Sequence, residues 1–172
     1  FSSRWALVLG ASSGFGAACS LALAKAGYNI FGVHLDRKST MDMAEKAIAD
    51  VKGTGREAVF FNKNAADEEA RNGVLDEIHK VLNGQSSVTV LLHSLAFGTL
   101  RPYLAEKAAD AVSKAQIEMT LDVMANSLVY WTQGLFNRRL LGRGGRIFAM
   151  TSAGDERVWA TYGPVSAAKA AL

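Results

Sequence analysis

The segment Gly10-Ala11-Ser12-Ser13-Gly14-Phe15-Gly16 joins an apolar run, Trp5–Leu9, to a run of helical composition, Gly14–Ala26. Its glycines follow the spacing G-x-x-x-G-x-G. The first lets the chain turn sharply off a strand, and the other two let backbone and ligand approach closely. Backbone amides at a helix N-terminus bind phosphate oxygens, so the segment predicts a dinucleotide-binding turn. The alternative is a strand–helix turn that is tight for packing alone. The residues predicted to contact the dinucleotide here are Gly10, Ser12, Ser13, Gly14, Phe15 and Gly16.

Short apolar runs and longer helical runs alternate after this turn. The predicted strands are Trp5–Leu9, Asn29–Leu35, Glu57–Asn62, Val88–His93 and Arg146–Thr151, and the predicted helices are Gly14–Ala26, Thr40–Lys52, Asp67–Leu82 and Ser113–Leu141. The strands are nearly continuous in apolar character, which is typical of strands covered on both faces. Strand–helix alternation gives right-handed crossovers and a parallel sheet. Because no repeat or linker interrupts the pattern, residues 1–172 predict one α/β domain, a doubly wound Rossmann sheet with helices on both faces.

Local signals predict where the helices begin and end. Ser39 stands three residues before Asp42, the capping-box arrangement. Gly27 and Gly84 stand where the first and third helices should end. The longest helix carries apolar residues at three- and four-residue steps, namely Ile117, Leu121, Met124, Leu128, Trp131 and Leu135. This stripe predicts a face packed on the sheet, with a subunit interface on the outer flank as the alternative.

The composition excludes several classes of function. Apolar residues make up 49% and charged residues 20%, which is typical of a globular protein with a core. The net charge is only +3 and the basic residues are scattered, so we expect no primary function in nucleic-acid binding. Cys19 alone can form neither an internal disulfide nor a metal site, and no apolar run reaches the roughly 18 residues of a membrane span. We therefore expect a cytoplasmic protein with no metal site.

Both ends of the sequence suggest a piece of a longer chain. It begins at Phe1 without an initiator Met, and the strand at Trp5 leaves no room for a secretory signal. It ends within a helix-forming run, Lys169–Leu172, that no Gly, Asn or Pro stops. We expect the domain to lack its C-terminal part.

An acidic residue follows the second predicted strand. In dinucleotide-binding folds such an acid, about 20 residues beyond the glycines, holds the adenosine ribose. Asp36 stands at this distance from Gly16, but Arg37 and Lys38 follow it directly. Asp36 favours the free 2′-hydroxyl of NAD, whereas Arg37 could meet the 2′-phosphate of NADP. The choice between NADH and NADPH stays open.

The chain resembles the short-chain dehydrogenase/reductase family over essentially all 172 residues. The turn at residues 10–16 matches the cofactor motif of that family, except that Leu9 stands where Thr is common. The resemblance implies that Asn64 and Ala65 contact the adenine. The segment His93-Ser94-Leu95-Ala96 stands where the family usually has Asn-Asn-Ala-Gly, which implies cofactor contacts for Ser94 and Ala96.

The most specific part of the resemblance lies near the C-terminus. The family's usual pattern is Tyr-x-x-x-Lys, but Tyr162 and Lys169 are seven residues apart and Val165 fills the usual Tyr position. Tyr-x6-Lys is the pattern of the divergent branch, the enoyl-[acyl-carrier-protein] reductases. Seven residues advance a helix by about 10.5 Å and return nearly to the same face. Pro164 is tolerated only in a first turn, so we expect the helix to begin near Gly163 with Tyr162 at its mouth.

The resemblance implies an NAD(P)H-dependent reductase of an enoyl thioester, as in fatty acid synthesis. Tyr162 would donate a hydrogen bond to the thioester oxygen as an enolate forms, and Lys169 would bind the nicotinamide ribose. Ser152 and Asn126 stand at the positions of the family's catalytic Ser and proton-relay Asn. By the same resemblance, the substrate is a small or carrier-bound acyl thioester, and the protein is a homo-oligomer, a tetramer or a dimer.

Two other functions compete with this one. Many enoyl reductases have an aromatic residue at the position of Ser152, so the Ser favours a carbonyl or 3-oxoacyl thioester reductase of the same fold. A non-catalytic dinucleotide-binding regulator would be expected to lose Tyr162, Lys169 or the glycines, and none is lost. His34 and His79 are interpreted as surface or strand-end residues.

Overall fold

Five parallel-running strands and the helices that connect them make up most of the computed structural model, which describes residues 4–172. The strands are β1 (Arg4–Leu9), β2 (Asn29–His34), β3 (Ala58–Asn62), β4 (Ser87–His93) and β5 (Leu141–Ala149). The longer helices are α1 (Gly14–Lys25), α2 (Met41–Lys52), α3 (Glu68–Leu82), α4 (Lys114–Leu121), α5 (Ser127–Asn137) and α6 (Gly163–Ala170). Short helical turns are η1 (Lys38–Thr40), η2 (Ala108–Asp110), the π-helical turn η3 (Asp122–Asn126) and η4 (Ala153–Asp155).

The chain forms two compact units. The first, here called the sheet unit, comprises the described residues up to Ser94 together with Trp131–Phe148. The second, here called the helical unit, comprises Leu95–Tyr130 and Ala149–Leu172.

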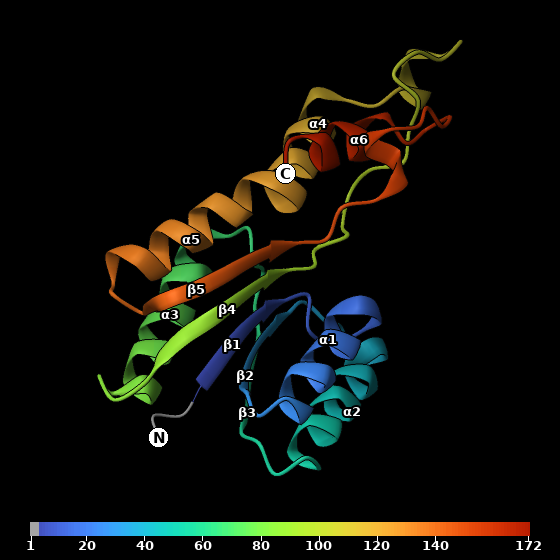
Figure 1. The fold of residues 1–172 in the computed structure, drawn as a ribbon. Coiled ribbons are helices and arrows are strands. Elements are labelled where there is room, and N and C mark those ends of the chain that lie inside the picture. Colours follow the sequence, from blue (N-terminus) through green and yellow to red (C-terminus); the bar gives the residue numbers. More distant parts are fainter. Residues whose placement is uncertain (1–3) are drawn as a thin grey trace. The chain divides into compact units, whose positions relative to one another are not determined.

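The sheet unit is built on the strand order β3-β2-β1-β4-β5. β1 pairs in parallel with both β2 and β4, and β2 pairs in parallel with β3. The central strands β1, β2 and β4 are largely buried, with α1 and α2 on one side of the sheet and α3 on the other (Figure 1). The order of the strands reverses between β1 and β4, and in open α/β sheets such a switch point is where ligands bind, beyond the carboxyl ends of the strands.

The helical unit has its own apolar core. Met124 and Ala125 of η3 are buried against Val165 and Ala168 of α6, and Tyr162 packs on the edge of this cluster. Across residues 4–172, no helix combines the length and the apolar character that crossing a bilayer would require.

The predicted fold is confirmed, and most strand bounds agree with the prediction to within one residue. The last strand is an exception, because β5 begins at Leu141 rather than Arg146 and ends at Ala149 rather than Thr151. Glycines at its start hid it from a pattern of apolar residues. The added part of the strand lies against β4, its neighbour in the sheet. Gly142 is so close to β4 that a Cβ there would overlap the side chain of Ser87.

The predicted long helix is also different in detail. It ends at Asn137 rather than Leu141, and the π-helical turn η3 divides it. Its apolar stripe nonetheless faces inward, since Met124, Trp131 and Leu135 are buried. The capping box predicted for Ser39 does not form, because the N-cap of α2 is Thr40, whose hydroxyl accepts from the Arg37 amide at 3.2 Å.

Candidate functional site

The glycine turn lies between β1 and α1 in the sheet unit. The amides of Gly10 and Ala11 both donate to the Val33 carbonyl, at 2.8 and 3.1 Å, which fastens the turn to β2. A Cβ at Gly16 would overlap the Gly10 carbonyl oxygen, so only glycine lets α1 start this close to the strand. Gly14 has open space around it but a φ of +52°, a conformation that other residues rarely adopt.

The first turn of α1 presents backbone amides without a competing side chain. Within residues 4–172, the N-cap Ser13 makes no side-chain hydrogen bond to these amides, and the first turn of α1 holds no acidic residue. The first amides of any helix have no intrahelical acceptor, and they carry the positive end of the helix dipole. This arrangement fits an anion such as a pyrophosphate.

Asp36 is held in a network that sequence reasoning missed. Its carboxylate lies 2.8 Å from Nδ1 of His34, and the hydroxyls of Ser12 and Thr40 also bond to it. The side chains of His34 and Asp36 are only 4% and 7% exposed. Burial alone would raise the pKa of Asp36, but the bonds from Ser12, Thr40 and His34 outweigh burial and hold that pKa below its ordinary value. His34 ends β2 as expected, yet it is buried rather than a surface residue.

The sequence held a signal for one part of this network, the pair His34 and Asp36. Residues two apart on an extended segment point to the same side, so His34 and Asp36 can meet. Arg37 and Lys38 remain exposed beside the network.

The other predicted cofactor residues of the sheet unit follow the ends of the remaining strands. Asn64 and Ala65 come after β3, where the Ala65 carbonyl accepts a hydrogen bond from Nε1 of the buried Trp131 at 2.8 Å. Ser94 comes after β4, and its amide donates to the Leu9 carbonyl at 2.9 Å. The glycine turn, Asp36, Asn64 and Ser94 therefore all follow carboxyl ends of parallel strands, which lie at one edge of a sheet. Ala96, two residues beyond Ser94, is an exposed residue of the helical unit.

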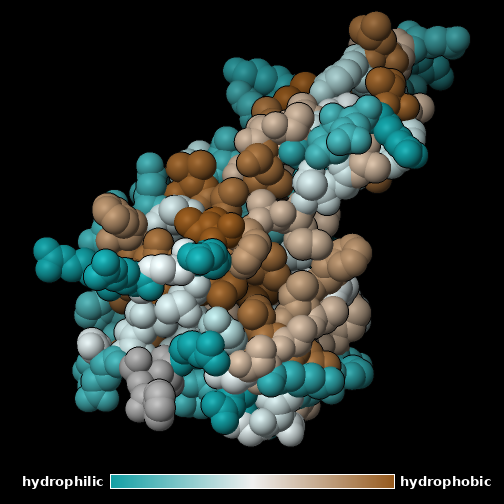
Figure 2. Space-filling model, viewed as in Figure 1, coloured by the Kyte–Doolittle hydropathy of each residue, from teal (hydrophilic) through white to brown (hydrophobic). Residues whose placement is uncertain are grey.

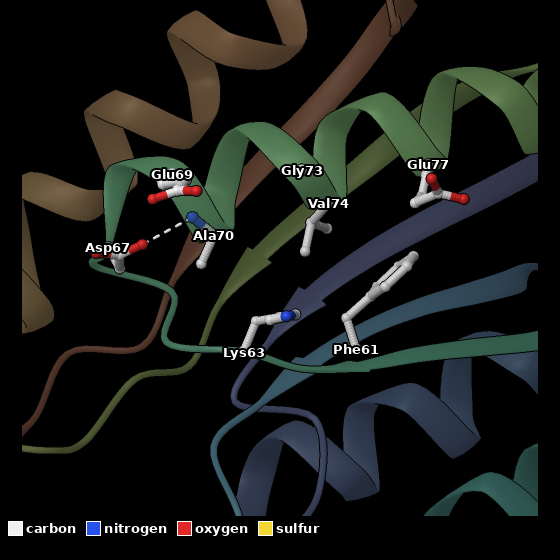
Figure 3. Close-up of a pocket in the computed structure, with 8 residues that line it drawn as sticks. All are labelled: Phe61, Lys63, Asp67, Glu69, Ala70, Gly73, Val74 and Glu77. Atoms are coloured by element: carbon white, nitrogen blue, oxygen red, sulfur yellow. Dashed lines mark hydrogen bonds between the residues drawn. The ribbon is translucent and has the colours of Figure 1, made fainter.

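A cavity of about 560 Å³ lies elsewhere in the sheet unit, along α3 and the end of β3 (Figure 3). Lys63 and Phe61 point toward α3 in this view, and the N-cap Asp67 accepts from the Ala70 amide at 2.7 Å. The lining residues are Phe61, Lys63, Asp67, Glu69, Ala70, Gly73, Val74 and Glu77. None of these is a predicted site residue, so the cavity is separate from the dinucleotide turn.

The predicted catalytic residues all belong to the helical unit. α6 begins at Gly163 with Pro164 in its first turn and Tyr162 as its N-cap, as predicted. The Tyr162 hydroxyl lies 3.5 Å from the hydroxyl of Ser152, and either can donate. Lys169 is 6% exposed, and its ammonium donates to the carbonyls of Met150 and Leu95 at 2.6 and 3.3 Å. Burial lowers the pKa of Lys169.

Asn126 occupies a different part of this unit. It ends the π-helical turn η3, its side chain is exposed, and it lines a shallow cavity of about 440 Å³ with Glu118, Met119, Leu121 and Asp122. The neighbouring residues Met124 and Ala125 join this turn to α6. π-helical turns within α-helices occur frequently at functional sites. The contacts of the described residues bring Ser152 and Tyr162 together, and they do not bring Asn126 to either.

Residues 4–172 hold no group of three or more His, Cys, Asp or Glu side chains that could bind a metal ion.

Comparison with known proteins agrees with these observations. Residues 10–172 match a family model described as Enoyl-(Acyl carrier protein) reductase. The 1-cyclohexenylcarbonyl-CoA reductase of Streptomyces collinus is 24% identical over 172 residues, covering 96% of this chain and 54% of the relative.

Solved structures resemble the chain as well. A short-chain dehydrogenase from Burkholderia cenocepacia in complex with NADP has a TM-score of 0.80 and 28% identity, covering 98% of this chain and 64% of that one. A dehydrogenase/reductase from Sinorhizobium meliloti has a TM-score of 0.83 and 25% identity, covering 100% and 63%. The chain thus spans little more than half of the curated relative and less than two thirds of these structures.

Proposed function

Because the chain belongs to the enoyl-(acyl carrier protein) reductase family, a branch of the short-chain dehydrogenases/reductases, we propose that it is an NAD(P)H-dependent oxidoreductase that reduces the double bond of an enoyl thioester. The observation that carries this proposal is the placement of Tyr162 at the N-cap of α6 and of Lys169 within that helix, seven residues apart, with Ser152 beside the tyrosine. The name of the Streptomyces relative, a reductase of a cyclohexenylcarbonyl thioester, supports the same substrate class.

The sheet unit has the features needed to hold the dinucleotide. The close approach of Gly16 to Gly10 and the uncapped amides of α1 fit its pyrophosphate. The residues that follow the carboxyl ends of β2 and β3 fit its adenosine. When bound, the cofactor supplies a hydride to the β-carbon of the substrate.

Tyr162 performs the main electrostatic step. As hydride reaches the β-carbon, negative charge develops on the thioester oxygen, and the phenol donates a hydrogen bond to it. A donor placed where charge develops stabilises the transition state more than the ground state. Ser152, 3.5 Å from the phenol, orients that hydroxyl.

Lys169 supports this step from deeper in the helical unit. An ammonium has three N–H donors, and two of them are taken by the carbonyls of Met150 and Leu95. The third N–H can donate to a ribose hydroxyl of the cofactor, and the positive charge stabilises the developing enolate. Asn126, at the end of η3, is proposed as the entry point of a proton relay to the product.

A carbonyl reductase is the second candidate. It is favoured by the Ser152–Tyr162 pair, because two hydroxyls 3.5 Å apart can also hold a ketone oxygen. The two reactions differ in where the hydride goes, to the β-carbon in an enoyl thioester and to the carbonyl carbon in a ketone.

A comparison of two substrates distinguishes the two candidate functions. Full-length protein is assayed with NADH and with NADPH against crotonyl and acetoacetyl thioesters. We expect oxidation of the cofactor with the crotonyl thioester and weak activity with acetoacetyl thioester. Efficient reduction of the ketone without reduction of the crotonyl thioester would refute the enoyl assignment and favour the second candidate.

A further inference from the structure

The ring of Tyr162 lies against residues to which the proposed reaction gives no role. Gly154, the buried middle residue of η4, faces the ring so closely that a Cβ there would overlap Cε1 and Cδ1 of the tyrosine. Trp159 lies at another side, with ring centroids 5.3 Å apart and ring planes at 73°, an edge-to-face contact.

The backbone between these two aromatic residues holds them together. The Tyr162 amide donates to the Trp159 carbonyl at 3.2 Å, which closes a turn over residues 159–162. Thr161 within this turn has a φ of +64°, although it is β-branched and not glycine. Residues held in this region of backbone space cluster at functional sites, where the surroundings enforce the conformation.

Packing alone does not account for the position of Trp159. Trp159 is 47% exposed, and its neighbour Val158 is fully exposed. Figure 2 shows other hydrophobic side chains, coloured brown, at the surface as well. A half-exposed Trp that keeps an oriented contact with one tyrosine is a poor contributor to the core, but it restricts the rotation of that tyrosine.

We propose that Gly154 and Trp159 are positioning residues for Tyr162, which together form a slot that fixes the phenol ring and aims its hydroxyl at the Ser152 hydroxyl. Gly154 leaves the space that the ring occupies, and Trp159 stops the ring from turning out of it. The hydroxyl then stays 3.5 Å from Ser152. This inference rests on the proposed function, because it assigns the slot to the residue that stabilises the enolate.

Kinetics of full-length variants with the crotonyl thioester test the slot. A misplacement of about 1 Å can cost roughly 10²-fold in rate, so we expect Gly154→Ala and Trp159→Leu to lower kcat by about 10- to 100-fold. KM and the Kd for cofactor should change little. Trp159→Phe keeps an aromatic edge and should restore most of kcat. Val158→Ala, at the neighbouring exposed position, is the matched control and should behave like the parent.

A second measurement reports on the ring without turnover. Ring-labelled tyrosines give a limited set of NMR signals, four of them from residues 1–172, and Tyr162→Phe identifies the one from Tyr162. Removal of the Trp159 ring current by Trp159→Leu should move that signal, whereas Val158→Ala should not.

The outcomes separate the two proposals. If Tyr162→Phe retains full activity, the proposed function fails, whatever the slot does. If Tyr162→Phe is inactive but Trp159→Leu keeps the parental kcat and the parental Tyr162 signal, the slot is refuted. It is also refuted if Trp159→Leu loses kcat and cofactor affinity together and Trp159→Phe restores neither, because that pattern is general structural damage.

Discussion

Two side chains at α6 carry the proposed chemistry, and their surroundings differ sharply. Tyr162 is half-buried at the N-cap of the helix, with its hydroxyl close to that of Ser152. Lys169 is buried and bonded to two backbone carbonyls. A phenol at the mouth of the site and an ammonium in its interior should therefore give different kinetic defects when they are removed.

Tyr162→Phe removes only the hydroxyl. We expect kcat on an enoyl thioester to fall by about 10²–10³-fold, the usual cost of losing one donor to a developing oxyanion. Substrate binding should change less, because the interaction strengthens only as charge develops. Steady-state kinetics of the variant and the parent with the enoyl thioester measure kcat and KM. Unchanged kcat would remove Tyr162 from the mechanism.

Lys169→Ala should reduce both turnover and cofactor affinity. The ammonium is assigned to the ribose as well as to the developing charge, so its loss affects the ground state of the complex and the transition state. Comparison of the cofactor Kd in this variant with that in Tyr162→Phe separates the two roles. Equal cofactor affinity in both variants would contradict the ribose contact.

Arg37→Ala tests which cofactor is preferred. The side chain of Asp36 is 7% exposed and has three side-chain partners, whereas Arg37 is exposed beside it. If Arg37 pairs with a 2′-phosphate, NADPH binding should weaken by about 1.5–3 kcal/mol and NADH binding should hardly change. Lys38→Ala, at the next exposed position, is the control. Equal losses for the two cofactors would point to Asp36 and to NADH.

At the scale of single elements, the glycine turn makes two different demands on its residues. Gly16→Ala places a Cβ on the Gly10 carbonyl, so the turn must move. We expect loss of cofactor binding together with lower thermal stability. In Gly14→Ala the new Cβ meets open space, and only the left-handed backbone is unfavourable for alanine. This conformation costs about 1–2 kcal/mol of folding stability, so the variant should be less stable but keep measurable cofactor binding. Calorimetry and thermal unfolding of both variants check this contrast, and identical binding defects would contradict it.

The elements also show what the sequence could and could not predict. Continuous apolar runs and the glycine turn predicted the sheet, and Pro164 predicted the start of α6, because these signals are local. The early start of β5 was not predictable, since its glycines pair with β4, a contact distant in the sequence. The π-helical turn η3 was also hidden, because its apolar residues keep the helical spacing while the backbone widens.

The candidate site was predicted unevenly for the same reason. Tyr162, Lys169 and Ser152 were found by their spacing, and α6 fixes the first two locally. The inward position of Asp36 depends on Ser12 and Thr40, which belong to other elements, and so it became visible only in the folded chain.

For the whole molecule, Asp36 links stability to pH. Its pKa in the folded state is lowered, so its contribution to stability is complete above the pKa of an unfolded Asp, about 3.9, and is lost as the pH falls through the lower pKa of the folded state. Asp36→Asn should therefore reduce the free energy of unfolding at pH 7 by about 1–3 kcal/mol, with a smaller difference near pH 2.5.

Urea unfolding of the parent and the variant at both pH values measures this difference. Asp50→Asn is the control, because the exposed pair of Asp50 with Lys46 should contribute little at any pH. A deficit for Asp36→Asn that is the same at both pH values would show that the carboxylate charge is not the stabilising feature.

The ammonium of Lys169 has a consequence for how relatives of this protein should be interpreted. Its two carbonyl partners lie 74 and 19 residues earlier in the chain, one in each of the two segments that build the helical unit. The lysine therefore ties both segments to α6, whether or not any reaction takes place. A lineage that abandoned turnover would be expected to retain this lysine for assembly, whereas the Tyr162 hydroxyl contacts Ser152, at 3.5 Å, within a single segment. Among relatives, a pseudoenzyme would thus reveal itself first by a phenylalanine at position 162, and a retained lysine at position 169 would be no sign of activity.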